Sequence, residues 1–380
     1  MTGRDRTPTD GPTTVVHLIT TLTQGGAERV LSQVVPRPGD APGERHVVVS
    51  LVEGGMFADV LRAAGVEVRD LGMRPGRDVV RGTRRLAALL RELRPTVIIA
   101  WMYHACLLAM LARPLAGAAG RTRLVWTLRG ALHAPETLSR STRRILPLLA
   151  RTSHIPDAVA INSHAGRTDH ERVGFRPRRW VHLPNGCDTH RFRPDATDRS
   201  AVRSEFGVTT ADALILFVGR AHPEKGIDVL LDALPLIAHP SPLTVVLAGA
   251  GTDGLSSTDG TVRRVGIGDR DDIGRLLRGA DALVLPSRTE GMPNAVIEAM
   301  ATGVPCVVTD VGDTAELVGD TGVVVPPGSP AAIAAGLRDL LAMDAASRAQ
   351  LGDAARERVA GRHDLATARA EYRSLWSEVA

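Results

Sequence analysis

A single lysine, Lys225, stands among the 46 basic residues of this 380-residue chain. It lies five residues after Arg220, and both residues flank a short turn that follows the apolar run 214–218. A lysine ammonium binds phosphate as a compact point charge, whereas a guanidinium binds it as a planar fork. Because the turn brings both cations within reach of one anion, we predict a phosphate site here. The alternative is a surface lysine without a ligand.

Two carboxylates separated by seven residues, Glu290 and Glu298, frame a second candidate site after the apolar run 282–285. Pro293 predicts the start of a helix, where free N–H groups favour an anion such as a diphosphate. The backbone predicted to face the ligand is that of Gly291, Met292, Pro293 and Asn294. A carboxylate accepts hydrogen bonds from vicinal hydroxyls, which suits Glu298 to a ribose or hexose. Taken alone, Glu298 also has a structural interpretation, because an acidic residue early in a helix stabilises the helix itself.

A glycine pair, Gly25 and Gly26, directly follows the first predicted strand. Glycines let the backbone approach a phosphate closely before a helix begins. The pair therefore predicts a second contact with the same ligand, although such a pair is common in ordinary turns.

The segment from Gly249 to Gly254 matches G-x-G-x-x-G, with Asp269 further along the chain. This pattern suggests a dinucleotide site, and an NAD-dependent oxidoreductase is the alternative function of another class. The fingerprint requires a helix that opens at its third glycine. The residues that follow Gly254 are polar and poor helix formers, so we expect the match to be accidental.

Short β-branched runs alternate with helical patterns along the whole chain, which predicts parallel, doubly wound sheets covered by helices. A turn near 183–188 and the polar stretch to about 203 predict the connection between two domains. Predicted strands are 15–19, 46–52, 66–71, 96–100, 124–128, 158–162, 213–218, 243–248, 262–266, 282–285 and 306–309. Predicted helices are 27–35, 57–64, 84–93, 105–111, 226–237, 271–277, 294–301, 331–341 and 365–379.

The net charge of +4 hides an asymmetry between the halves. Residues 1–190 hold 27 arginines against 16 acidic residues, whereas residues 191–380 carry a net charge of −7. The basic half suggests an anionic acceptor or peripheral contact with an anionic membrane face. A solvated helix face is the plainer interpretation of its arginine clusters. No basic run is interleaved with aromatic residues, so we expect no nucleic-acid partner.

Three cysteines without a C-x-x-C pair, a polar N-terminus and the lack of a long apolar run predict a cytoplasmic protein. H-E-x-x-H does not occur in the sequence, and we expect no metal and no cofactor.

Together these residues resemble the retaining family 4 glycosyltransferases of the GT-B fold, over most of the chain. The matching motifs, in order, are Gly25-Gly-Ala-Glu28, Ile161-Asn-Ser163, Pro184-Asn-Gly186, Val218-Gly-Arg220, Glu224-Lys-Gly226, Ala248-Gly-Ala-Gly251, Leu285-Pro-Ser287, Glu290 to Glu298, and Gly303-Val-Pro-Cys306 to Glu316. The resemblance implies two Rossmann-like domains that face a central cleft. It divides the chain into a disordered tail (1–13), an acceptor-side domain (14–187), a nucleotide-sugar domain (188–361) and a helix that crosses back to the first domain (362–380).

By the same resemblance, Arg220 and Lys225 hold the donor diphosphate and stabilise it as it leaves. Glu290 and the amides after it contact the donor sugar, Glu298 binds the ribose, and the glycine pair approaches the donor from the other domain. The implied reaction transfers a hexosyl group from a nucleoside-diphosphate sugar with retention. The acceptor is a glycan, a lipid-linked sugar as in surface polysaccharide or glycolipid assembly, or a small soluble metabolite.

The chain departs from the family pattern after the predicted strand 124–128, where many relatives carry a histidine and this chain has Arg129. His133 and His104 lie in nearby loops, and with Arg129 they form the predicted acceptor side. Each histidine also has a purely structural interpretation.

Overall fold

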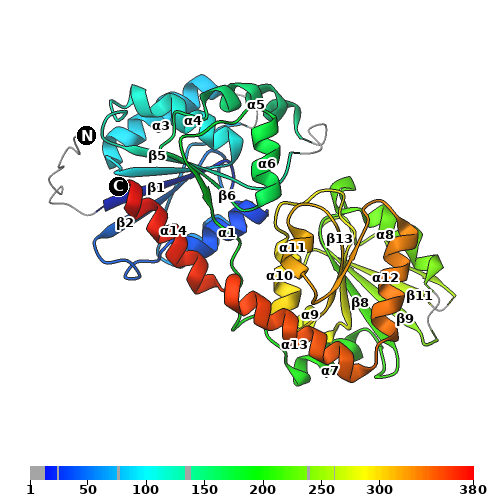
Figure 1. The fold of residues 1–380 in the computed structure, drawn as a ribbon. Helices are drawn as coiled ribbons and strands as arrows, with labels where there is room; N and C mark the ends of the chain where they lie inside the picture. The colour runs from blue at the N-terminus through cyan, green and yellow to red at the C-terminus, as the bar shows by residue number, and fades with distance from the viewer. Residues whose placement is uncertain (1–12, 24, 75–77, 133–137, 238–239, 261) are drawn as a thin grey trace.

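The computed structural model describes residues 13–380 except 24, 75–77, 133–137, 238–239 and 261, so most of the predicted tail and His133 lie outside the described residues. Two lobes lie side by side, each built on one seven-stranded sheet with helices on its faces (Figure 1). Every pair of neighbouring strands is parallel except the edge pair β10–β11. The predicted α/β fold of two doubly wound domains is confirmed.

The N-terminal sheet has the order β3-β2-β1-β4-β5-β6-β7. Its strands are β1 (Thr13–Ile19), β2 (Glu44–Ser50), β3 (Glu67–Asp70), β4 (Val97–Trp101), β5 (Arg123–Leu128), β6 (Ala158–Ile161) and β7 (Trp180–His182). The central strands β4 and β6 are buried along their whole length, which is why they read as unbroken apolar runs. The chain leaves β1 on one side and returns on the other at β4, so the carboxyl ends of β1 and β4 form a switch point where ligands bind in such sheets.

Helices cover both faces of this sheet. One layer consists of α3 (Val79–Leu93), α4 (Met102–Leu115) and α5 (Arg140–Thr152), which lie side by side (Figure 1). The opposite face carries α1 (Gly26–Val34) and α2 (Met56–Ala63). The remaining helix, α6 (His164–Arg172), lies on the side toward the second lobe (Figure 1).

The C-terminal sheet has the order β10-β11-β9-β8-β12-β13-β14, with its own switch point between β8 and β12. Its strands are β8 (Ala213–Val218), β9 (Leu243–Ala248), β10 (Ser257–Asp259), β11 (Val262–Gly268), β12 (Ala282–Leu285), β13 (Cys306–Thr309) and β14 (Val323–Val325). Its helices are α7 (Ala196–Glu205), α8 (Ile227–Ala233), α9 (Ile273–Gly279), α10 (Asn294–Ala301), α11 (Thr314–Val318), α12 (Pro330–Ala342) and α13 (Ala345–Arg362), with short 3₁₀ turns at Pro223–Lys225 and Leu234–Leu236.

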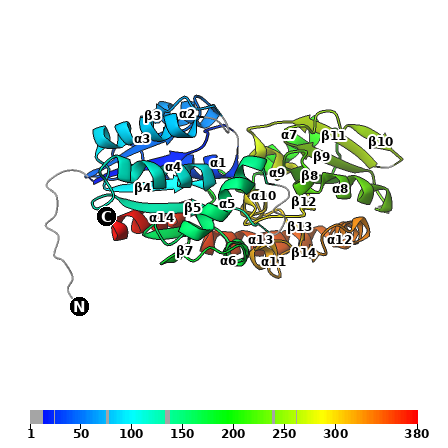
Figure 2. The ribbon, with the colours of Figure 1, turned by 90° about the horizontal axis from the view of Figure 1, so that it is seen from above.

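The last helix, α14 (Leu365–Val379), leaves the C-terminal domain and packs against the first one (Figure 2). Tyr372 stacks on Trp101 with ring centroids 5.6 Å apart, and the buried Trp376 packs against the rings of His17 and His46. The chain crosses between the domains twice, and the two crossings are joined at Cys187, whose N–H donates to His363 O and whose carbonyl accepts from Leu365 N.

The prediction of a polar connection over 188–203 is wrong in part, because residues from 196 onward form α7. Asp195 caps this helix by accepting from Asp198 N, and the guanidinium of Arg203 is buried against Asp281 at 2.9 Å. The polar character of this stretch therefore does not mark a loop, since Arg203 is paired inside the protein. The predicted helix 226–237 is also divided, since α8 ends at Ala233 and the chain continues as a 3₁₀ turn that contains Pro235.

Candidate active site

The switch point of the C-terminal sheet brings Lys225 and Glu290 together, although 65 residues separate them in the chain. Lys225 follows β8 and Glu290 follows β12, and Lys225 Nζ lies 2.6 Å from Glu290 Oε1. Ser287 Oγ donates to the same oxygen at 2.7 Å, so the buried Glu290 carboxylate has a fixed orientation. The lysine side chain is 25% exposed, which leaves its ammonium open to a ligand.

Gly226 allows this close approach of the two loops. It has a φ of +62°, and a Cβ built there would lie 2.0 Å from the carbonyl oxygen of Pro286. No other residue type fits this contact. Arg220, on the same loop, is exposed toward the cleft, where its charge acts on Glu28 of the opposite domain.

The backbone from Gly291 to Asn294 leads into α10. Pro293 occupies the N-cap position without a side-chain cap, so the N–H groups of the first turn are left for another acceptor. Asn185, on the crossing between domains, fixes the segment from the other side. Its Nδ2 donates to Met292 O at 2.8 Å and to Asn294 Oδ1 at 2.7 Å.

The N-terminus of α1 faces the N-terminus of α10 across the cleft. Gly25 is extended and forms no side-chain cap, and a Cβ built on Gly26 would lie 3.9 Å from Asn294 Nδ2. Two helix N-termini from different domains therefore converge on one place, where both macrodipoles favour an anion. The carboxylate of Glu28 curls back over Gly25, and burial raises its pKa.

Glu298 lies one turn further along α10 and is 6% exposed. Its Oε1 is 2.8 Å from Arg29 Nη2 of α1, which makes an ion pair between the domains. Burial raises the pKa of Glu298, against the opposing effects of Arg29 and Arg191. Its second oxygen, Oε2, is buried without a hydrogen-bond partner among the described residues.

Two further contacts close the cleft in this structure. A Cβ built on Gly291 would lie 2.9 Å from Gly130 Cα, so the loops after β12 and β5 touch backbone to backbone. Asp313 accepts hydrogen bonds from the backbone N–H groups of His164 (2.6 Å) and Ala165 (2.8 Å), and so caps α6 from the other domain.

Of the three residues predicted for the acceptor side, the structure describes Arg129 and His104, while His133 lies outside the described residues. Arg129 is buried, lies over the ring of Trp101, and donates to Asn185 Oδ1 and Tyr372 Oη. These contacts join β5 to the domain crossing and to α14. His104 is half-buried on the first turn of α4, and burial lowers its pKa.

The Gly249–Gly254 segment does not have the structure of a dinucleotide fingerprint. It turns from β9 toward the short edge strand β10, and no helix opens at Gly254. Gly249 packs against the backbone of Gly219, since a Cβ there would lie 2.1 Å from Gly219 O. Gly249 allows the loops after β8 and β9 to pack closely. The G-x-G-x-x-G match therefore no longer supports the oxidoreductase alternative.

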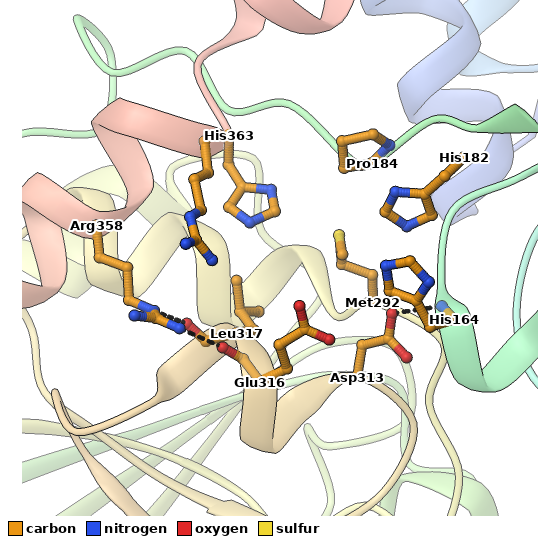
Figure 3. Close-up of a pocket in the computed structure, with 10 residues that line it drawn as sticks. His164, His182, Pro184, Met292, Asp313, Glu316, Leu317, Arg358 and His363 are labelled. Carbon is orange, nitrogen blue, oxygen red and sulfur yellow. Dashed lines mark hydrogen bonds between the residues drawn. The ribbon is translucent and has the colours of Figure 1, made fainter.

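A pocket of about 140 Å³ lies at the junction of both domains and the α13–α14 segment (Figure 3). His164 and His182 stack on one side of it with ring centroids 4.2 Å apart, while Arg358 donates to the carbonyls of Glu316 and Leu317 on the other. Met292 is the one residue of the predicted donor site among those that line it. The pocket therefore adjoins the predicted donor site at Met292 and is otherwise separate from it.

Within the described part of the chain, no three His, Cys, Asp or Glu side chains gather as metal ligands. None of the helices in that part combines the length and apolar character needed to cross a bilayer.

Known proteins with similar sequences support the arrangement described above. The profile of Glycosyltransferase Family 4 matches residues 13–191, and that of Glycosyl transferases group 1 matches residues 212–343. A GDP-mannose-dependent α-(1-6)-phosphatidylinositol monomannoside mannosyltransferase of Mycolicibacterium smegmatis is 30% identical over 281 residues, which cover 69% of this chain and 70% of that protein. The chain belongs to glycosyltransferase family 4.

Other relatives in this family match over shorter segments. A D-inositol 3-phosphate glycosyltransferase of Segniliparus rotundus is 33% identical over 175 residues, and the match covers 42% of this chain and 38% of that protein. This chain thus spans less than half the length of that relative. Among solved structures, Anabaena HepE in complex with UDP and glucose superposes with a TM-score of 0.82 at 23% identity, covering 96% of this chain and all of the other. This likeness supports the GT-B fold.

In this family 4 chain, the sequence patterns predict the residues of the donor loops but not the residues that connect the domains. Asn185 belongs to one of the motifs that resemble the family, yet nothing in the sequence around it predicts its contacts with Met292 and Asn294. Arg29 directly follows the Gly25–Glu28 motif, and this adjacency is the only signal that could have suggested it.

Proposed function

We propose that this chain is a retaining glycosyltransferase that moves a hexosyl group from a nucleoside-diphosphate sugar to an acceptor hydroxyl. The convergence of Arg220 and Lys225 with the N-termini of α1 and α10 carries the proposal. Two cations and two helix dipoles around one cleft favour a multiply charged anion such as a diphosphate. The buried Glu298 carboxylate, one helical turn away, suits the ribose of the same donor.

The proposed chemistry follows from where charge develops. When the bond between the anomeric carbon and the diphosphate breaks, negative charge grows on the leaving oxygen, and fixed cations stabilise that state. Glu290 uses Oε1 to hold the Lys225 ammonium in place. Its other oxygen, Oε2, would accept from a hydroxyl of the donor sugar. The departing phosphate oxygen takes the acceptor proton on the same face, so configuration is retained without a protein nucleophile, and neither a metal nor a cofactor enters the proposal.

Replacement of Lys225 tests this proposal. We expect Lys225→Ala to lower sugar transfer by about 10²–10³-fold, the usual loss when one stabilising group is removed, and to weaken nucleoside-diphosphate binding in calorimetric titrations with UDP, GDP and ADP. Lys225→Arg should also be impaired, because a planar fork does not reproduce the ammonium. Arg338→Ala, on the exposed face of α12, is the control for loss of a cation. Unchanged transfer by Lys225→Ala, or binding of NAD but of no nucleoside diphosphate, would contradict the proposal.

We further propose that the acceptor is a lipid-linked sugar reached at an anionic membrane surface. The α3–α4–α5 layer supports this. Residues 79–115 and 138–152 contain a single acidic residue, Glu92, beside many exposed arginines. Exposed apolar side chains lie on the same three helices: Val79, Val80, Leu111, Leu115 and Leu148. Arginines next to exposed apolar side chains fit an interface with anionic lipid headgroups.

The alternative acceptor is a small soluble metabolite. In that case the arginines would only solvate the helix faces, and transfer would not respond to vesicles. The proposed location is the cytoplasm, with peripheral contact at the inner face of the membrane.

A further inference from the structure

The two oxygens of Glu298 have different surroundings. Oε1 is paired with Arg29 Nη2 at 2.8 Å, whereas Oε2 is buried and accepts no hydrogen bond from any described residue. A buried carboxylate oxygen without a donor is costly, and proteins rarely leave one unless a ligand or water supplies the donor. Oε2 therefore marks a position for a hydroxyl of the ligand.

The place of Glu298 on α10 agrees with a ribose. It follows Asn294, the first residue of the helix, by four positions, and helical side chains tilt toward the N-terminus. Its carboxylate thus lies about one turn, roughly 5.4 Å, along the helix from the anion position at the helix start. A ribose attached to a diphosphate at that start would have its hydroxyls next to this carboxylate.

Arg29 is held in place before any ligand binds. Its guanidinium lies 6.0 Å from the ring centroid of Phe192, and the guanidinium of Arg191 lies 5.5 Å from the same ring. Phe192 is 1% exposed, so its ring is a fixed support. A cation over an aromatic ring is stabilised, and a rigid guanidinium loses little further freedom when it binds a carboxylate.

We infer that Arg29 is a positioning residue of the nucleotide site, which holds Glu298 ionised and oriented so that the ribose hydroxyls donate to it. The inference rests on the proposed function, because it takes the ligand to be a nucleoside-diphosphate sugar. It adds that the ribose subsite is completed by the N-terminal domain. A nucleotide then binds tightly only when α1 and α10 lie against each other.

The electrostatics of Glu298 predict a characteristic pH dependence of ribonucleotide binding. The charged or titratable groups that act with it are Arg29 from α1, Arg191 from the domain crossing, and the thiol of Cys187. Burial raises the pKa of Glu298, and Arg29 is the larger of the two cationic effects that oppose this rise. Loss of Arg29 should therefore protonate Glu298 at a higher pH, and a protonated carboxyl accepts fewer hydrogen bonds from a ribose.

The test is calorimetric titration with UDP, 2′,3′-dideoxy-UDP and pyrophosphate, or with the GDP or ADP pair if the wild type prefers another base. Arg29→Ala should bind the ribonucleotide about tenfold or more weakly, the usual effect of losing a hydrogen bond to a charged group. The wild-type preference for ribose over dideoxyribose should nearly disappear, while pyrophosphate binding stays unchanged. As the pH is lowered, ribonucleotide affinity should begin to fall at a higher pH in Arg29→Ala than in the wild type. Arg29→Lys should restore part of the affinity that Arg29→Ala loses.

Two comparisons make the result decisive. Glu298→Gln should lose the same ribose preference, and the double variant should lose no more than either single one. Arg179→Ala breaks an exposed ion pair with Glu378 of α14 (2.7 Å) and serves as the matched control. An Arg29→Ala protein with an unaltered or stronger ribose preference would overturn the inference, while the donor site itself still stands. A wild type that binds no nucleoside diphosphate would instead overturn the proposed function.

Discussion

At the scale of residues, Gly291 is a position where the backbones of the two domains lie close together. A Cβ added to Gly291 would lie 2.9 Å from Gly130 Cα, and no side-chain motion can relieve a clash with backbone. Its backbone does not require a glycine, since its φ lies outside the left-handed region. A side chain at 291 would therefore act by separating the loops after β5 and β12.

We expect Gly291→Ala to lower sugar transfer by at least tenfold, because a small misplacement of the groups around a reacting centre is costly. Thermal unfolding should change little, because the clash lies between domains. Gly254→Ala is the matched control, since a Cβ at Gly254 meets nothing within 4 Å. Full transfer by Gly291→Ala would show that the two loops are not in contact during the reaction.

The sequence predicts the candidate site well within each domain and poorly between domains. Lys225 and Glu290 follow strands that lie next to each other in a doubly wound sheet, so the strand pattern alone brings them to one edge. The pairs Arg29–Glu298 and Asp313–His164 depend on how one domain rests on the other. No local pattern encodes that arrangement.

At the scale of elements, the same distinction holds. Strands and helices that consist mainly of apolar residues, such as β8, β9 and α10, begin and end where they are predicted. The helices α5, α6, α7 and α13 are absent from the prediction because their sequences are rich in Arg, Asp and Ser. In α7 the buried pair of Arg203 and Asp281 stands beside the apolar packing of Val202, a contact that only the folded chain supplies.

The α3–α4–α5 layer leads to a prediction for membrane binding. The double variant Arg143→Glu, Arg144→Glu reverses two exposed charges on α5. Each basic residue near an anionic surface contributes about 1 kcal/mol. The change from attraction to repulsion should therefore weaken cosedimentation with phosphatidylserine vesicles at least tenfold.

A matched reversal on the C-terminal domain, at the exposed Arg338 of α12, should leave vesicle binding unchanged. Equal binding by the α5 variant and the wild type would exclude this layer as the membrane surface. Binding to RNA in place of vesicles, lost in the α5 variant, would point to a different macromolecule on the same face.

At the scale of the whole molecule, histidines that are wholly or partly shielded from solvent make the folded state sensitive to acid. Burial lowers the pKa of six of them, namely His17, His46, His104, His170, His182 and His363. Such groups stay neutral in the folded protein while the unfolded chain takes up protons below pH 6.5. The stability that they contribute is present above pH 6.5 and is lost as the pH falls toward the folded pKa values.

His170 allows a quantitative test, because burial lowers its pKa to about 4. Its share of the loss in unfolding free energy between pH 6.5 and 4 is roughly 3 kcal/mol. We expect His170→Gln to show a shallower decline over this interval in urea unfolding. All four tryptophans lie in the N-terminal domain or α14, so their fluorescence reports on the part of the protein that contains His170. An equal slope in the variant and the wild type would mean that His170 takes up its proton at the same pH in the folded and the unfolded chain.

The position of α14 has a consequence for how the protein is made. Tyr372, Leu375 and Trp376 belong to the same core cluster as Val15 and Ile19 of the first strand. As the ribosome produces the chain, the N-terminal domain emerges first but lacks the helix that, beside α1 and α2, covers part of one face of its sheet. That part stays exposed until the whole C-terminal domain has been synthesised, so the first domain to emerge is the last to be finished. A chaperone that binds nascent chains would find its natural target there, and a stop codon shortly before Leu365 would damage the domain that is farthest from it in sequence.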